Sequence, residues 1–495
     1  MSSLADKAGI LVASNLIKYA VGFVMPMVLV RMLTRTDYGT YQQLALLATI
    51  GTAILTLGVP SSVYYFFDRN DPLRDKALTL QTTVIMAISG LFTAALVMFG
   101  APLIVTLTKN AALAPLLGWY GAALGLLIAS EHFVQFMIAQ DRYRVAVVVE
   151  TSETVVRVLI LVLPLLAGHG LMGLVLANIA YATLRFALRS AWLLLPLRPL
   201  AEGLRAPWTC GTQLAYAVPL GLMSLVAVVG SMLDRGIVAT RFTAADYAIY
   251  SVGALEIPLD SIFQASVATV LRAALPALIR AGRHDEVVRL MHEGVRKLSL
   301  IVLPCFVFLL FYSHEFITTL FTTEYERSVS VFRIYVFLMP LNMFLLSPIP
   351  PAYGRTKVNL HVVAVVTAIH LVLSFALLHW IGFYGPAVSA ISTSYLLSGF
   401  YFLYARRLTG GTVAQLLPLR TFAKVLAAAG VAAMVAKFAL SGSVHGVLGL
   451  AASGALYSVA FVAMCFVLRV FSDVDRALAR RWFARLTGGS GRFAD

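Results

Sequence analysis

The sequence is poor in charge and in cysteine. Of its 495 residues only 12% are charged, against about 25% in an average soluble protein. Its three cysteines, Cys210, Cys305 and Cys465, lie far apart in or beside apolar stretches. This spacing excludes a disulfide framework and a zinc site. The sequence also has no glycine-rich phosphate loop, so neither ATP hydrolysis nor a bound cofactor is predicted.

Long polar segments are missing too, whereas long apolar runs fill the chain, which is 60% hydrophobic. A helix needs about 20 apolar residues to cross a hydrocarbon core of roughly 30 Å. Its backbone polar groups must then pair within the helix. The sequence therefore predicts an all-α, polytopic membrane protein with about 14 transmembrane helices. The predicted spans lie near residues 8–32, 41–67, 78–107, 113–138, 146–166, 171–195, 212–234, 246–270, 298–321, 328–350, 358–381, 385–405, 421–440 and 446–471.

The net charge is +15, and the positive residues are distributed unevenly between the two sides of the predicted membrane. If the N-terminus is cytoplasmic, most of the 38 Lys and Arg residues fall in loops and tails on the cytoplasmic side. This asymmetry orients the chain with both termini in the cytoplasm of a bacterial inner membrane. The first apolar run is too long for a signal peptide, so it is predicted to remain as the first helix. The basic excess thus indicates membrane lipids as neighbours, and no nucleic-acid partner.

A weak internal repeat divides the chain. The segment from Arg31 to Tyr41 reads R-M-L-T-R-T-D-Y-G-T-Y, and the segment from Thr240 to Tyr250 reads T-R-F-T-A-A-D-Y-A-I-Y. Each copy opens the second helix of a set of six, and two such parallel repeats predict two lobes around a central cavity. The predicted domains are an N-terminal lobe (1–200), a C-terminal lobe (201–410), two further helices (411–472) and a basic amphipathic cytoplasmic tail (473–495).

The chain resembles a known family at these positions. Asn15, the R-x-L-x-x-x-D-Y-G-x-Y motif, Leu57-Gly58 and the turn at 354–357 are similar to Wzx-type polysaccharide flippases. These belong to the multidrug/oligosaccharidyl-lipid/polysaccharide (MOP) exporter superfamily. The resemblance implies alternating access that carries an undecaprenyl-diphosphate-linked oligosaccharide outward for surface or exopolysaccharide synthesis. The resemblance also implies a polysaccharide polymerase and other assembly proteins as candidate partners.

Ionisable side chains inside a span are costly, so each is a candidate for function. Lys18 lies near mid-membrane and shares a polar helix stripe with Asn15, a candidate cavity-lining residue. It is interpreted either as a contact to the substrate diphosphate or as the partner of a carboxylate. Arg31 and Arg235 lie near the outer ends of their helices, where snorkelling toward headgroups is the alternative. The predicted diphosphate-binding residues are Lys18, Arg157, Arg31 and Arg235.

Carboxylates in the spans are candidates for ion coupling. Glu153 precedes Arg157 by four residues, the favourable order for a helical ion pair, whereas Glu150 has no partner on its own helix. Glu256 and Asp260 share one face of the eighth span, where they either balance the cations of the cavity or hold an ion. A surplus acid in a low dielectric takes a proton or binds a cation. Proton or sodium coupling is therefore predicted through Glu150, Glu153, Glu256 or Asp260.

Two rival functions stay open. A MATE-like antiporter for cationic drugs would need a cavity dominated by carboxylates, and Lys18 and Arg157 argue against it. A membrane glycosyltransferase or polymerase would need a sizeable outer loop, and the predicted outer loops are short. The sequence therefore favours a secondary transporter that flips a lipid-linked glycan over an enzyme.

Overall fold

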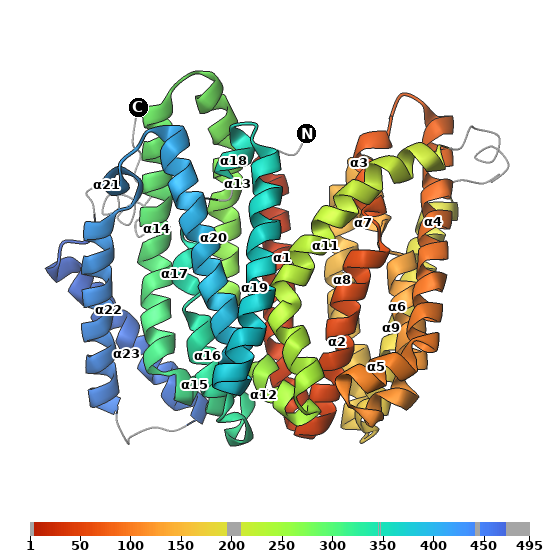
Figure 1. Cartoon of the computed structure of the whole chain (residues 1–495), viewed down its shortest axis with the longest axis horizontal. Coiled ribbons are helices and arrows are strands. Elements are labelled where there is room, and N and C mark those ends of the chain that lie inside the picture. The colour runs from red at the N-terminus through yellow and green to blue at the C-terminus, as the bar shows by residue number, and fades with distance from the viewer. Residues whose placement is uncertain (1–3, 196–208, 345, 347, 441–445, 472–495) are drawn as a thin grey trace, which may run out of the picture. The chain divides into compact units, whose positions relative to one another are not determined.

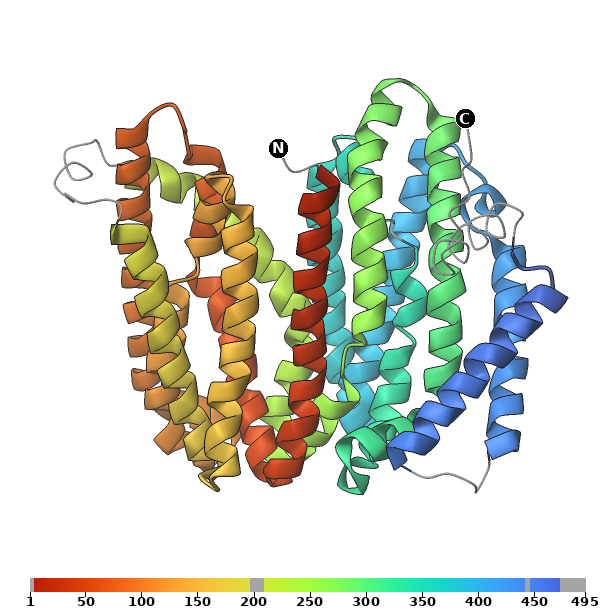
Figure 2. The same ribbon diagram turned by 180° about the vertical axis from the view of Figure 1, so that it is seen from behind.

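The structure, a computed structural model, describes residues 4–195, 209–344, 346, 348–440 and 446–471. Over these residues all regular elements are helices (Figures 1 and 2). The predicted all-α class is therefore confirmed. The predicted tail at 473–495 lies outside the described residues, as do the side chains of 4–15 and of several positions between 258 and 360.

Each predicted span coincides with one helix or with two or three consecutive helices. The α-helices are α1 (Leu4–Met32), α2 (Arg35–Leu55), α3 (Val59–Phe66), α4 (Pro72–Phe99), α5 (Ala101–Thr108), α6 (Ala114–Ala129), α7 (Phe133–Ala139), α8 (Tyr143–Leu166), α9 (Gly170–Leu194), α11 (Cys210–Arg241), α12 (Ala244–Gly253), α13 (Pro258–Arg280), α14 (His284–Phe311), α15 (Ser313–Phe321), α16 (Ser328–Val336), α17 (Met339–Asn342), α18 (Ile349–Ala352), α19 (Thr356–Ile381), α20 (Gly385–Thr409), α21 (Val413–Leu416), α22 (Leu419–Leu440) and α23 (Gly446–Val467). Short 3-10 turns lie at Ala111–Leu113, Thr323–Tyr325 and Gly382–Tyr384.

Nine helical stretches within the described residues are long and apolar enough by themselves to cross a membrane. This number is lower than fourteen for identifiable reasons. The stretch at 361–409 covers two predicted spans, α19 and α20. Helix α8 has the length of a span but carries three charged residues, Glu150, Glu153 and Arg157, which exclude it from a count of purely apolar stretches. The chain is therefore a multi-pass membrane protein.

The second predicted span is broken between α2 and α3. Leu57 and Gly58 both have positive φ, 49° and 69°, so the helix cannot continue through them. A Cβ atom at Gly58 would lie 2.6 Å from the backbone nitrogen of Gly221 on α11. Only glycine permits both this backbone conformation and this close approach of two helices. The break therefore fixes α3 against α11.

Small residues also let α4 and α6 pack closely. A Cβ atom at Gly90 would lie 2.3 Å from the carbonyl oxygen of Gly125, and one at Gly125 would lie 2.5 Å from that of Gly90. Such contacts drive helix association in lipid, where apolar burial gains little. Around them lies a core of buried side chains that includes Leu117 and Leu124.

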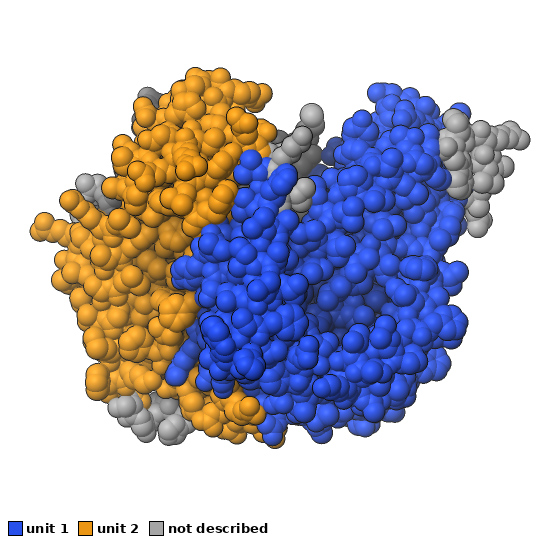
Figure 3. Space-filling view, in the orientation of Figure 1, with its two compact units in different colours: residues 1–262, 330–334, 357–397 blue, residues 263–329, 335–356, 398–495 orange. Residues whose placement is uncertain are grey.

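The helices form two compact units, coloured separately in Figure 3. Unit 1 contains residues 1–262, 330–334 and 357–397, and unit 2 contains 263–329, 335–356 and 398–495. The face of unit 1 that Figure 3 presents is hollowed. The lobe boundaries given by the sequence stay a prediction.

Candidate functional site

The two copies of the internal repeat begin their helices in the same way. The hydroxyl oxygen of Thr34 accepts a hydrogen bond from the Asp37 amide at 3.1 Å, and the hydroxyl donates to the Asp37 carboxylate at 2.7 Å. Thr243 and Asp246 make the same two contacts at the same distances at the start of α12. Such a cap satisfies free amides of the first turn and places an acid at the positive end of the helix. The matching geometry supports the repeat that the sequence suggests.

The two repeated segments also pack on each other in unit 1, because α2 contacts α12 along its first turns. A Cβ atom at Gly39 would lie 1.7 Å from the carbonyl oxygen of Ala244. Beside this contact the buried Tyr250 hydroxyl donates to the buried Asp234 carboxylate at 2.9 Å. This end of unit 1 is therefore tightly packed, and Asp234 is part of its structure.

Lys18 lies in the middle of α1, which packs against α8. Its ammonium donates to the Glu150 carboxylate at 2.5 Å. Both side chains stay accessible, with exposed fractions of 32% and 31%. Tyr64, an exposed residue of α3, interacts electrostatically with Glu150. A lysine and a glutamate inside the helices thus neutralise each other, and neither side chain is buried.

Glu153, one turn further along α8, has a different partner from the one that its spacing suggests. Its carboxylate accepts hydrogen bonds from Arg189 of α9 at 2.9 and 2.6 Å, and Arg185 lies at 4.0 Å. Arg189 also donates to the Ser130 carbonyl at 3.1 Å. The predicted pairing with Arg157 is therefore wrong. The planar guanidinium of Arg189 reaches Glu153 through two parallel bonds, which a neighbour on the same helix does not achieve here.

Arg157 lies elsewhere. Its guanidinium carbon is 5.7 Å from the ring centre of Tyr181, a cation–π contact, and the residue is exposed. A contact of this kind contributes about 0.5–1 kcal/mol at an exposed site. The arginine is thus held by an aromatic face and keeps donors for another anion. The side chains of Asn15 and Asp260 lie outside the described residues, so their predicted roles stay predictions.

The two outer arginines bind backbone oxygens of their own region. Arg31 donates to the Met27 carbonyl at 2.7 Å, and Arg235 donates to the Ala254 carbonyl at 2.9 Å. The Glu256 carboxylate lies 3.8 Å from Arg235 and is 78% exposed. Glu256 is therefore close to Arg235, and its predicted roles, as a balancing charge for the cavity cations or as an ion-coupling residue, stay predictions.

Three charged residues of this region were missed by the sequence reasoning: Glu131, Arg185 and Arg189. Arg185 donates to Glu131 at 2.6 Å, and Arg189 holds Glu153. The signal was present, since all three lie inside predicted spans and the arginines are four residues apart on one helix face. The positive-inside pattern assigns the two arginines to the cytoplasmic charge, and Glu131 has no charged partner on its own helix that would single it out.

Unit 1 thus contains several ion pairs between side chains of its helices. In the described part of the chain, no three His, Cys, Asp or Glu residues come together as a possible metal site. The partly exposed cations Lys18 and Arg157 are the groups best placed to bind a negatively charged ligand.

The helical fold and these charges inside the helices describe a multi-pass membrane protein. Over residues 28–330, the sequence matches the model of the family described as polysaccharide biosynthesis protein. Because this match covers more than half of the sequence, the chain belongs to that family. Among curated protein sequences no match was found.

Solved structures share the fold. A lipid II flippase, MurJ, in an inward-closed conformation has 12% identity and a TM-score of 0.67, covering 94% of this chain and 98% of that one. An inward-facing MATE-family multidrug resistance transporter of the MOP superfamily has 12% identity and a TM-score of 0.64, with coverage of 83% and 95%. A MOP-superfamily transporter from Pyrococcus furiosus has 12% identity and a TM-score of 0.54, with coverage of 82% and 95%. The chain therefore has the MOP transporter fold, and the resemblance found in the sequence is confirmed.

Proposed function

We propose that the protein flips a polyprenyl-diphosphate-linked oligosaccharide repeat unit across the bacterial inner membrane by alternating access. The family membership supports a role in polysaccharide biosynthesis, and the fold supports transport rather than an enzymatic reaction. The observation that carries the proposal to an anionic lipid-linked substrate is the accessible pair between Lys18, in the middle of α1, and Glu150 of α8.

The proposed chemistry is an exchange of anions at Lys18. Without substrate, the Lys18 ammonium donates its hydrogen bond to the Glu150 carboxylate. A diphosphate that enters offers more negative charge and more acceptor oxygens than one carboxylate, and it displaces Glu150 through charge-assisted hydrogen bonds. Arg157, Arg31 and Arg235 are the further cations assigned to the passage of the two phosphates. The polyprenyl tail stays in the lipid phase throughout, so the protein does not need a binding site for it.

The displaced Glu150 supplies a route to ion coupling. Once its cation is taken, a carboxylate away from bulk water takes a proton or binds sodium. That event favours one of the two access states only if the ion binds them with different affinity. Glu153, Glu256 and Asp260 complete the proposed coupling set, although Glu153 is already held by Arg189.

The same ion pairs disfavour a transporter for cationic drugs. Glu150 is neutralised by Lys18, Glu153 by Arg189 and Glu131 by Arg185, so these acids leave no surplus negative charge for a cation. A polysaccharide polymerase and other assembly proteins are proposed as partners, because a flipped repeat unit must be joined into a polymer.

The proposed orientation has both termini in the cytoplasm. Reporter fusions after Arg283 and after Arg492 are expected to report cytoplasm. Fusions after Lys109 and after His169 are expected to report periplasm. A periplasmic signal from the fusion after Arg492 would contradict an even number of spans.

Substrate class is tested with purified protein in liposomes. Three fluorescent probes are compared: a short polyprenyl diphosphate carrying an oligosaccharide, the matching monophosphate and a cationic dye. The diphosphate probe is expected to become accessible to an external quencher fastest, because the site binds two phosphates. Faster movement of the cationic dye would favour a drug antiporter, and equal rates for diphosphate and monophosphate would remove the proposed diphosphate site.

A further inference from the structure

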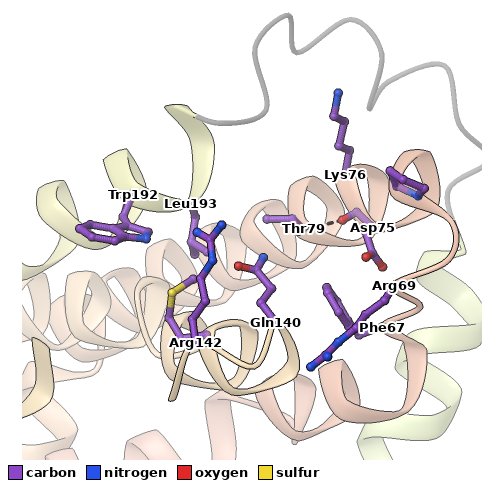
Figure 4. A pocket seen from close by; sticks show the side chains of 11 residues that line it. Phe67, Arg69, Asp75, Lys76, Thr79, Gln140, Arg142, Trp192 and Leu193 are labelled. Atoms are coloured by element: carbon purple, nitrogen blue, oxygen red, sulfur yellow. Dashed lines mark hydrogen bonds between the residues drawn. The ribbon is translucent and has the colours of Figure 1, made fainter. Parts of the chain in front are cut away.

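Unit 1 contains a cavity of about 360 Å³ that the transport site does not use (Figure 4). It lies where the α3–α4 loop, the start of α4, the α7–α8 turn and the end of α9 meet. All four segments lie at one membrane end of their helices, which the predicted topology places in the cytoplasm. The cavity therefore opens at the membrane surface rather than in the middle of the bundle.

Its charged lining is mainly basic. Arg69, Lys76 and Arg142 line it together with one acid, Asp75. The Asp75 carboxylate already accepts from the Asp68 amide at 2.9 Å, and Arg69 is anchored by two bonds to the Ala139 carbonyl at 3.2 and 2.8 Å. In Figure 4 Arg142 extends toward Leu193, and the Lys76 side chain extends from α4 away from the other labelled side chains. Three lining cations against one engaged carboxylate favour an anion, and Asp68 and Asp71 beside Asp75 reduce this preference.

The rest of the lining is mostly apolar and includes Phe67, Met137 and Trp192, beside the uncharged polar residues Thr79 and Gln140. Trp192 is exposed and continues a stripe of exposed apolar side chains along α9, with Leu188 one turn and Leu184 two turns before it. Tryptophan at the end of a span lies at the level of lipid headgroups. A cavity with cations on one side and an apolar stripe leading away from it matches a molecule with an anionic head and an acyl chain.

We propose that this cavity binds the phosphate headgroup of an anionic membrane lipid. The phosphate lies against Arg142, with Lys76 as a second cation at the edge of the cavity, and the first part of the acyl chains lies along Trp192 and Leu188. A free inorganic phosphate shares the headgroup chemistry, but it has no acyl chain that could contact the apolar side of the cavity. Basic pockets between membrane helices on the cytoplasmic side bind such headgroups by the same physics. This site is separate from Lys18 and does not depend on the proposed transport function.

The test measures binding of defined lipids to the full-length protein in detergent by native mass spectrometry. The probes are dioleoyl phosphatidylglycerol, dioleoyl phosphatidylcholine and inorganic phosphate. Phosphatidylglycerol is expected to bind more tightly than phosphatidylcholine. Arg142→Gln is expected to weaken phosphatidylglycerol about tenfold, which corresponds to about 1.4 kcal/mol.

The chain offers matched controls on the same surface. Arg144 and Arg74 are exposed arginines, each two residues from a lining cation and absent from the lining. Arg144→Gln and Arg74→Gln are expected to leave lipid binding within about twofold of the parent. If Arg142→Gln lowers the thermal midpoint, Lys76→Gln replaces it in the comparison.

The source of the phosphate is decided by a second variant. Trp192→Ala is expected to weaken phosphatidylglycerol and to leave inorganic phosphate unchanged. Displacement of the lipid by millimolar inorganic phosphate would overturn the lipid assignment in favour of a soluble anion. Unchanged lipid binding in both Arg142→Gln and Lys76→Gln, or an equal loss in Arg144→Gln, would overturn the site itself.

Discussion

Helix α8 supplies two glutamates three residues apart, and their surroundings differ. Glu153 and its partner Arg189 are 13% and 4% exposed, and two parallel hydrogen bonds join them. Glu150 and its partner Lys18 are each about one third exposed and share one hydrogen bond. A buried, doubly bonded pair fixes two helices, because breaking it leaves a charge without water. An accessible pair with one bond can exchange its partner. The comparison therefore separates a structural ion pair from a functional one.

The largest effect is expected for Arg189→Met, which removes the main partner of Glu153. The variant leaves Glu153 buried with only Arg185 nearby, at 4.0 Å. We expect the free energy of unfolding to fall by about 3 kcal/mol, the cost of an uncompensated buried charge. Thermal unfolding in detergent, followed by loss of the monodisperse peak, measures it.

The double variant Glu153→Gln/Arg189→Met is the control for the Arg189→Met measurement. Because it removes both charges, it is expected to recover part of the lost stability. An equally unstable double variant would show that packing of the arginine, and not its charge, is what matters.

Much of the fold could be predicted from the sequence, because the membrane imposes helices of known length on apolar runs. The starts of α2 and α12 were also predictable, since Asp37 and Asp246 recur in one motif and each makes the same cap. The break in the second span at Leu57–Gly58 was harder to predict from the sequence. The break depends on the contact of Gly58 with α11, a neighbour that the local sequence does not name.

The candidate site was predictable in its residues but not in its pairs. Lys18, Glu150 and Glu153 stand out because a charge inside a span is costly. Their partners depend on how α1, α8 and α9 are rotated against each other, and helical spacing carries no information on that rotation. Spacing therefore favoured Arg157 for Glu153, whereas the neighbouring helix supplies Arg189.

The accessible pair is tested by Lys18→Ala. Loss of one charge-assisted contact to the diphosphate costs about 1.5–3 kcal/mol, so we expect flipping of the diphosphate probe to fall at least about tenfold. The thermal midpoint is expected to change little, because accessible ion pairs contribute about 0–1 kcal/mol. Initial rates in liposomes and thermal unfolding are measured on the same preparations.

Lys437→Ala is the matched control for Lys18→Ala, because Lys437 lies 3.3 Å from Glu315 in another accessible lysine–glutamate pair, in unit 2. It is expected to flip the probe at the parent rate. Normal flipping by Lys18→Ala would move the diphosphate contact to Arg31 and Arg235.

A smaller effect is expected for Glu150→Gln, which keeps the shape of the site and removes the group that takes up the ion. An imposed proton or sodium gradient is expected to speed the parent by about fivefold, the lower end of typical coupling between two sites. The variant is expected to flip at one rate with or without the gradient. A parent that ignores both gradients would show that the substrate's own gradient drives transport.

The smallest effect is expected for Glu131→Gln, at the edge of the buried group. Glu131 accepts from Arg185 at 2.6 Å, but it is 38% exposed, so water can replace the carboxylate. Arg185 also keeps Glu153 at 4.0 Å. We therefore expect a loss of at most about 1 kcal/mol in unfolding free energy, the range of accessible pairs, and an unchanged flipping rate. A loss as large as that of Arg189→Met would mean that Glu131, Glu153, Arg185 and Arg189 act as one network. Exposure would then no longer separate the structural pairs from the functional one.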